Sequence, residues 1–305
     1  MLISSQAFLS VTQELAAKWK FSPLFISLVI VALGTNLPEL TVTSVALYKQ
    51  EADLAMANLI GSSIANITLI FGTAALFGTV RLGTNKSQKN TVLLLSITVL
   101  FVVLLLSSIT NINKAFIFFL AISASLLYQY LTARNGRLHE DKKLLNKLQH
   151  MYFKKRKYSK LYYSSMLITT TAGLAIGGLV TVTAVESLAH ILGYATSVLG
   201  LTLTAVSTSL PELLLTVLAS QKQENKVVLG TLVGSNVFNL ALFPGIILAI
   251  GDQGPISTWE LYSLLIITIF FSIMIFMYKG RNIPKKISLA LIAVFMVFVW
   301  RTLVP

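Results

Sequence analysis

Long apolar runs separated by short polar breaks dominate the chain from residue 21 to its end. Each run exceeds the ~18 residues that mark a candidate membrane-spanning helix. The breaks contain nearly all the charged side chains, as expected for loops at the two membrane surfaces. The pattern predicts spans at about residues 21–48, 54–80, 90–110, 114–133, 161–192, 195–220, 227–250, 258–278 and 285–304.

The segment before residue 21 is too short and too polar to cross a bilayer alone, and it resembles the second half of a further helix. It shows no signal peptide, because a basic start and a small-residue cleavage site are both missing. We therefore expect ten helices, the first without its outer half. We also expect the true start of the protein to lie upstream of Met1.

Composition supports an all-α polytopic membrane protein. The chain has 305 residues, of which 55% are hydrophobic and only 11% charged, with no cysteine. Soluble domains carry about 25% charged residues, so a soluble globular protein, a disordered chain and a disulfide scaffold are all excluded. The spans contain no nucleophile–base pair, so neither an enzyme nor a cofactor is expected.

The net charge of +13 suggests nucleic acid until the basic residues are located. Ten of the 24 lie between Arg134 and Lys160, and the others flank apolar runs, so we expect no nucleic-acid partner. With the amino end outside, the inner segments carry a net charge of +17 and the outer segments −2. Because Lys and Arg favour the cytoplasmic side, the loop 134–160 is predicted to be cytoplasmic, in a multi-pass protein of the plasma or inner membrane.

The inner and outer segments together carry +15, and two further glutamates reduce this to the net charge of +13. Glu39 and Glu212 are the ionisable residues placed deep inside apolar spans. A carboxylate at that depth is costly and by default marks an ion site or a pathway. The alternative is a protonated glutamic acid that only joins neighbouring helices, but two cases in matching contexts favour an ion site.

The two glutamates lie in an internal repeat. Residues 34–72 align without gaps on residues 207–245, at an offset of 173, with 16 identities in 39 positions. The helix with Glu212 comes five spans after the helix with Glu39, so the second copy is predicted to run the opposite way across the bilayer. This is the inverted repeat of many secondary transporters. We expect a first repeat at 1–133, the basic loop at 134–160 and a second repeat at 161–305, with five helices in each repeat.

Each copy gathers oxygen atoms around its glutamate. Pro38 and Pro211 are predicted to kink their helices and to free backbone carbonyls. Gly61 and Gly234 are expected to permit close helix contact. A serine follows each glycine, and an asparagine follows that serine four residues later, so the two share one helix face: Ser62 with Asn66, and Ser235 with Asn239. An all-oxygen shell with two carboxylates suits a hard cation such as Ca²⁺, and the three histidines lie in loops or at helix ends, which argues against zinc.

GTNLPEL with GSSIAN, and STSLPEL with GSNVFN, resemble the two α-repeats of the calcium/cation antiporter superfamily, in its prokaryotic sodium/calcium exchanger branch. The resemblance implies a ten-helix inverted pair that exchanges Na⁺ for Ca²⁺ by alternating access. The ion ligands that it implies here are Glu39, Glu212, Asn66, Ser62, Ser235, Ser209, Thr35, Thr208 and the carbonyls of Ala32 and Ala205. Asn36 replaces the usual serine and keeps a coordinating oxygen, and Asn239 stands where several relatives have aspartate, which argues against potassium co-transport.

Several functions remain open. The leading hypothesis is Na⁺/Ca²⁺ exchange, and H⁺/Ca²⁺ exchange through the same carboxylates is the alternative. A channel is less favoured, since an inverted repeat within one chain supplies two gates around one site. An inactive membrane scaffold is the third reading, suggested by the short first helix. The expected partners are Ca²⁺, Na⁺ or H⁺ and the lipid bilayer, and no obligate protein partner is evident.

Overall fold

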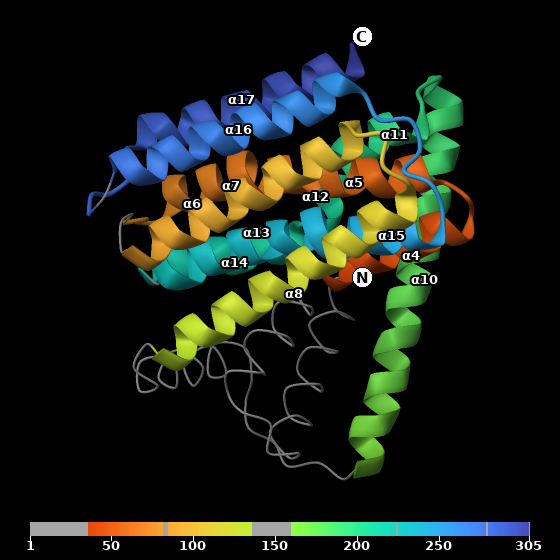
Figure 1. The fold of residues 1–305 in the computed structure, drawn as a ribbon, viewed down its shortest axis with the longest axis horizontal. Coiled ribbons are helices and arrows are strands. Elements are labelled where there is room, and N and C mark those ends of the chain that lie inside the picture. Colours follow the sequence, from red (N-terminus) through yellow and green to blue (C-terminus); the bar gives the residue numbers. More distant parts are fainter. Residues whose placement is uncertain (1–35, 82–84, 136–159, 224, 279, 305) are drawn as a thin grey trace.

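The fold is helical throughout the part of the chain that the computed structural model describes, namely residues 36–81, 85–135, 160–223, 225–278 and 280–304 (Figure 1). One isolated antiparallel bridge joins Arg81 and Asn282. The elements are α4 (Leu37–Tyr48), α5 (Ala52–Ala65), η2 (Asn66–Ile70), α6 (Phe71–Phe77), α7 (Asn85–Leu106), α8 (Asn111–Asn135), α10 (Lys160–Leu192), α11 (Thr196–Leu199), η3 (Gly200–Thr204), α12 (Ala205–Thr208), α13 (Leu210–Gln221), α14 (Asn225–Val237), η4 (Phe238–Leu242), α15 (Phe243–Ile250), α16 (Thr258–Met277) and α17 (Lys285–Leu303). The predicted all-α class is confirmed.

Most of the predicted spans are present in the described residues. Seven helices are long and apolar enough to cross a membrane, at Ala52–Phe77, Gln88–Leu106, Asn111–Gln129, Ile168–Leu192, Val227–Ile250, Thr258–Met277 and Lys285–Leu303. A bent pair of helices between Thr196 and Gln221 supplies an eighth. Each of the eight overlaps a predicted segment. The ninth predicted span, 21–48, lies largely outside the described residues, and its described part forms α4.

The span predicted at 195–220 is not one continuous helix. It bends by 46° between Thr208 and Leu210, where α12 ends and α13 begins. Pro211 therefore lies in the first turn of a new helix, where its missing N–H leaves no hydrogen bond unmade. The proline was predicted to kink a helix from within, and the structure instead places a full helix break just before it.

The internal repeat is visible in the helix boundaries. α13, α14 and α16 begin 173 residues after α4, α5 and α7 respectively, which is the offset of the sequence alignment. The turns after α4 and α13 also match, because Gln50 and Gln223 both adopt a positive φ, of 65° and 58°. The same backbone is therefore built twice, well beyond the 39 aligned residues.

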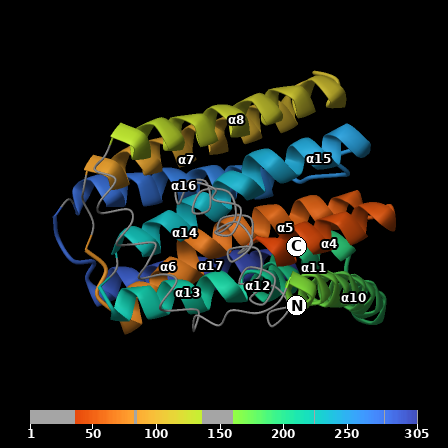
Figure 2. The same ribbon diagram turned by 90° about the horizontal axis from the view of Figure 1, so that it is seen from below.

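The two copies run in opposite directions. In both views the α5–α6 helix runs one way and the α14–α15 helix runs back beside it (Figures 1 and 2). At one end the backbone N–H of Arg81, after α6, donates to Asn225 Oδ1 at the start of α14, at 2.9 Å. At the other end Gly254, after α15, packs against Asp53 at the start of α5. The repeat is therefore inverted, as predicted.

Contacts between helices follow the same approximate two-fold symmetry. α6 packs on α17 as α15 packs on α8, and α7 and α16, which are equivalent, pack on each other. The α5–α6 and α14–α15 spans form the centre, since 83% and 72% of their most apolar stretches are buried, against 22% for α17. A helix that is apolar on all sides belongs at such a centre.

A close helix contact joins the two repeats at Gly61. A Cβ on Gly61 would lie 2.3 Å from the carbonyl oxygen of Leu201, so only glycine fits between α5 and η3. This confirms the packing role predicted for Gly61. The equivalent Gly234 has no described atom within 4 Å of such a Cβ.

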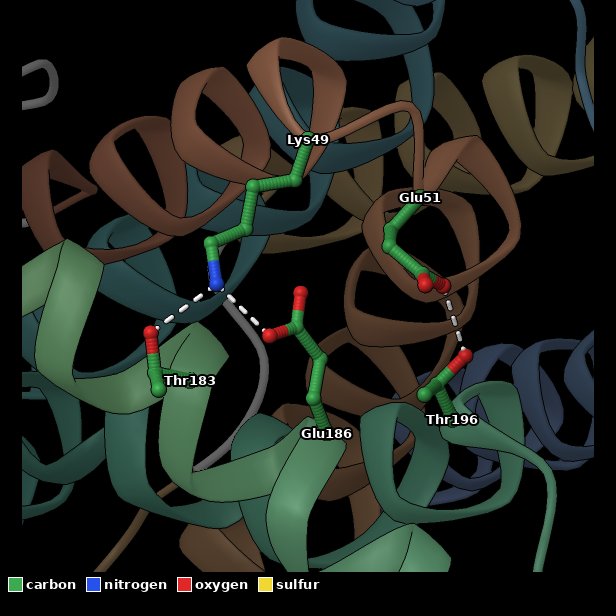
Figure 3. A network of polar contacts seen from close by, with 5 residues as sticks. All are labelled: Lys49, Glu51, Thr183, Glu186 and Thr196. Carbon is green, nitrogen blue, oxygen red and sulfur yellow. Dashed lines mark hydrogen bonds and ion pairs between the residues drawn. The ribbon is translucent and has the colours of Figure 1, made fainter.

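A group of polar contacts also joins the repeats, at one end of the α4–α5 hairpin (Figure 3). Lys49 Nζ lies 2.6 Å from Glu186 Oε2 and 2.9 Å from Thr183 Oγ1, both on α10. Beside it, Thr196 Oγ1 at the start of α11 donates to Glu51 Oε2 at 2.8 Å. These contacts fix the start of the second repeat against the turn of the first.

Candidate functional site

Both glutamates lie in the first turn of a helix at the centre of the molecule. α4 begins after Asn36 and α13 after Ser209, and the two preceding residues have almost the same backbone angles, φ −88° and ψ 10° against φ −84° and ψ 9°. Glu39 and Glu212 follow the prolines, and both side chains are buried, at 1% and 0% exposed. The free N–H groups and the dipole at a helix start favour a carboxylate there.

Each carboxylate accepts a hydrogen bond from a serine of the second repeat. Ser209 Oγ donates to Glu39 Oε1 at 3.1 Å, which joins the two repeats directly. Ser235 Oγ on α14 donates to Glu212 Oε1 at 3.2 Å. Ser209 and Ser235 are thus placed beside the glutamates, as their prediction as ligands requires.

The break before α13 brings further oxygen atoms beside α5. Ser62 Oγ lies 3.3 Å from Thr208 Oγ1 and 3.3 Å from the carbonyl oxygen of Ala205. Thr208 Oγ1 also lies within donating distance of Asn58 Oδ1, at 3.3 Å. The hydroxyls and the Ala205 carbonyl therefore form one buried group across the repeat boundary.

The two central helices meet through asparagine side chains. Asn66 Nδ2, at the start of η2, donates to Asn236 Oδ1 on α14 at 2.8 Å. Asn236 Nδ2 in turn donates to the carbonyl oxygen of Ser63 at 3.3 Å. Ser63 and Asn236 are equivalent positions of the repeat, so their contact places them at its approximate two-fold axis.

Several buried oxygen atoms in this region have no hydrogen-bond donor among the described residues. They include Glu39 Oε2, Asn66 Oδ1 and Asn239 Oδ1. Buried polar atoms are nearly always paired, so an unpaired group of acceptors calls for an explanation. A bound cation supplies one, because oxygen atoms of carboxylates, amides and hydroxyls are the ligands of Ca²⁺.

The structure brings most of the predicted ligands into this one region. Glu39, Glu212, Ser62, Thr208, Ser209, Ser235, Asn66 and the Ala205 carbonyl are linked by the contacts above, directly or through neighbours on the same helix. Asn36 is buried at the start of α4 and Asn239 is buried in η4. Ala32 and Thr35 lie outside the described residues, so their prediction stays untested.

Three residues of the region were not predicted as ligands: Asn58, Ser63 and Asn236. Each is completely buried in a central helix. A signal was present, since a polar residue inside an apolar span beside a recognised motif is unusual. Asn236 in particular directly follows Ser235 in the motif GSNVFN.

Carboxylates are few in the site. Among the described residues no three or more His, Cys, Asp or Glu side chains gather closely enough to hold a metal ion. His190, the one histidine within those residues, is exposed at the end of α10. The carboxylates of this region are those of Glu39 and Glu212, and the other oxygen atoms named beside them are neutral.

Comparison with known proteins agrees with this arrangement. The family model described as "Sodium/calcium exchanger protein" matches residues 1–133 and 163–304. The sodium/calcium exchanger MaX1 of Methanosarcina acetivorans is 27% identical to the chain, over 96% of the chain and 93% of that protein. The putative antiporter CaxA of Alkalimonas amylolytica is 29% identical, over 81% of the chain and 76% of that protein.

The fold also matches solved structures of the sodium-calcium exchanger NCX_Mj. The TM-score is 0.65 at 21% sequence identity, over 97% of the chain and 93% of the exchanger. The family match covers most of the chain, and the relatives are transporters. The chain therefore belongs to the sodium/calcium exchanger family, and it is a multi-pass membrane cation antiporter rather than an enzyme.

Proposed function

We propose that the protein exchanges Na⁺ for Ca²⁺ by alternating access, with the ions bound between the repeats by Glu39 and Glu212. The observation that carries this proposal is the pairing of two buried carboxylates with hydroxyl, amide and carbonyl oxygen atoms from both repeats. We propose the full ligand set as the two glutamates with Ser62, Ser235, Asn66, Asn239, Asn36, Ser209, Thr35, Thr208 and the carbonyls of Ala32 and Ala205.

Charge balance explains why the two cations would exchange. Two ionised carboxylates carry −2, which one Ca²⁺ or two Na⁺ neutralise. A buried, uncompensated charge is costly, so the site favours a full load of either kind. Since the loads compete for the same oxygen atoms, the binding of one weakens the binding of the other, which couples their movements.

The names of relatives support the same cations. MaX1 is named a sodium/calcium exchanger, and the NCX_Mj crystals were soaked with Na⁺ and with Ca²⁺ or Sr²⁺. CaxA is named only as an antiporter. Calcium with sodium is therefore the pair of ions that we propose for this chain.

We further propose how the chain is arranged in its membrane. Repeats at 1–133 and 161–305 flank the basic loop 134–160, which lies in the cytoplasm, and the membrane is the plasma or inner membrane. The basis is the surplus of Lys and Arg in that loop.

Flux measurements in proteoliposomes test the function. Vesicles loaded with Na⁺ and diluted into Na⁺-free buffer with ⁴⁵Ca²⁺ are expected to accumulate calcium, and collapse of the Na⁺ gradient abolishes the uptake. Glu39→Gln and Glu212→Gln should each lower the rate by about 100-fold, because each removes a buried charge worth at least ~3 kcal/mol. Glu260→Gln, at a half-buried glutamate of α16, is the matched control and should keep the wild-type rate.

Proton coupling is the second candidate, favoured by the buried Glu39 Oε2, which has no donor among the described residues and is able to take a proton. The same vesicles separate the two candidates. Calcium uptake that ignores the Na⁺ gradient and follows an imposed pH gradient would replace Na⁺ with H⁺ in this proposal.

A further inference from the structure

We propose that Asn236 is a positioning residue that turns the amide oxygen of Asn66 toward the bound cation. This inference rests on the proposed function, since it concerns how the same ion site is built. Asn236 is completely buried on α14, and it contacts α5 and η2 of the other repeat through both ends of its amide.

The reasoning starts from the two ends of an asparagine amide. One end is an oxygen that binds cations, and the other is an NH₂ group that repels them. Asn66 donates its Nδ2 to Asn236 Oδ1 at 2.8 Å. That bond commits the NH₂ end, so Asn66 Oδ1 faces away from Asn236, buried and without a donor among the described residues.

Asn236 is itself held in one orientation. Its own Nδ2 donates to the backbone carbonyl of Ser63 at 3.3 Å, and a backbone carbonyl accepts but never donates. Asn236 Oδ1 must therefore point to Asn66. The direction of Asn66 thus follows from a backbone group through two successive hydrogen bonds.

Asn239, the asparagine of the second repeat, has no equivalent positioning residue. The position equivalent to Asn236 is Ser63, and the residue equivalent to Asn66 is Asn239. Ser63 Oγ has no partner among the described residues, and neither amide atom of Asn239 has one either. Among the described residues the amide of Asn66 is therefore held by hydrogen bonds, and the amide of Asn239 is not.

This asymmetry predicts unequal roles for two ligands that the sequence makes look equivalent. Asn66 presents its oxygen before the cation arrives, so it binds without a reorientation cost. Asn239 must be turned by the cation itself. Loss of Asn236 should therefore weaken calcium binding although Asn236 does not touch the ion.

The experiment measures calcium affinity of the purified full chain by calorimetry, together with the melting temperature with and without calcium. Asn236→Ser is expected to weaken calcium binding by about tenfold, the usual scale for a residue that orients a metal ligand. The swap variant Ser63→Asn with Asn236→Ser keeps the side-chain volume and moves the asparagine to the other repeat. It should orient Asn239 in place of Asn66 and bind calcium within about threefold of wild type.

The readouts separate positioning from simple packing. If Asn236 only packed the helices, Asn236→Ser would lower the calcium-free melting temperature while the calcium affinity of the folded protein stayed at the wild-type value, and that result overturns the proposal. If Asn236→Ser does not fold, the swap variant decides: near wild-type affinity supports positioning, and a tenfold loss overturns it. If the wild-type protein binds no calcium, the proposed function itself fails, and this inference fails with it.

Discussion

At the scale of single residues, the site combines two charges with many neutral oxygen atoms. Ser209 and Ser235 each donate to one carboxylate, at 3.1 and 3.2 Å. A hydroxyl placed this way serves two states, since it satisfies the carboxylate in the absence of an ion and offers a lone pair to a cation when one is bound. Glu39 Oε1 and Glu212 Oε1 therefore each have a polar partner when no cation is bound.

The hydroxyl of Ser209 gives a direct prediction. Ser209→Ala removes the donor to Glu39 and should weaken calcium binding by about tenfold, since a hydrogen bond to a charged group contributes about 1.5 kcal/mol. Ser207→Ala is the matched control, because Ser207 lies two residues away, is exposed and donates to the carbonyl oxygen of Leu203, one turn earlier. Equal affinities in the two variants, measured by calorimetry, would show that Ser209 does not serve the site.

The sequence predicts which polar residues gather between the repeats where the signal is local. Glu39 and Glu212 stand out because charge inside an apolar span is costly, and Ser62 and Ser235 follow from their spacing in the repeated motif. Asn236 and Ser63 could not be found in this way. Their importance depends on contact between helices 173 residues apart in the chain, and spacing along one helix says nothing about its partner.

At the scale of elements, the central helices depart from regular α geometry. η2, η3 and η4 are short π-helical segments, and η2 and η4 contain the equivalent residues Asn66 and Asn239. Such segments leave the usual hydrogen-bond ladder and are frequent at functional sites. Here they lie in the middle of spans, where a regular helix would present the same side chains on a different face.

The contact between α5 and η3 gives a prediction for packing. Gly61→Ala would place a methyl group 2.3 Å from the Leu201 carbonyl, so the two helices must separate. We expect a loss of about 1–3 kcal/mol of stability, typical of overpacking, and weaker calcium binding because the Ala205 carbonyl would move. A lower melting temperature of the purified protein measures the first effect.

Gly251→Ala is the matched control for Gly61. Gly251 is exposed, has a negative φ of −150°, and a Cβ there would meet no described atom closer than 3.9 Å. Its melting temperature should equal that of the wild type. Equal values for both variants would contradict the close contact between the repeats.

Helix positions were largely predictable because the bilayer demands long apolar runs, and the eight spans found in the described residues all overlap predicted segments. The break before α13 was predicted only as a kink, and the π segments were not predicted at all. Hydropathy reports which residues avoid water. It carries no information on whether a buried backbone keeps its i to i−4 hydrogen bonds.

At the scale of the whole molecule, the inverted repeat gives the transporter two similar halves that meet at the proposed ion site. Ser209, directly before α13, donates to Glu39 in the first turn of α4, and the equivalent residues Ser63 and Asn236 touch at the axis. Two halves of similar energy are suited to exchange their roles on the two sides of the membrane, which alternating access requires.

Cysteine labelling tests this inverted arrangement. The chain contains no cysteine, so a single introduced cysteine is the one thiol that a maleimide can label. Gln50→Cys and Gln223→Cys occupy equivalent exposed turns and should react with an impermeant maleimide from opposite sides of the membrane. Ser159→Cys, in the loop proposed to be cytoplasmic, should react from the same side as Gln223→Cys. Labelling of Gln50→Cys and Gln223→Cys from one side would contradict an inverted repeat.

The most direct test of the account is competition between Na⁺ and Ca²⁺ for the purified protein. If both ions neutralise the same two carboxylates, the apparent Kd for calcium should rise with the Na⁺ concentration. At high Na⁺ it should become proportional to the square of that concentration, because two Na⁺ replace one Ca²⁺. Glu39→Gln and Glu212→Gln should each bind calcium at least 100-fold more weakly, which is about 2.7 kcal/mol. Calcium binding that is unchanged by Na⁺, or that survives the loss of both glutamates, would contradict the central claim.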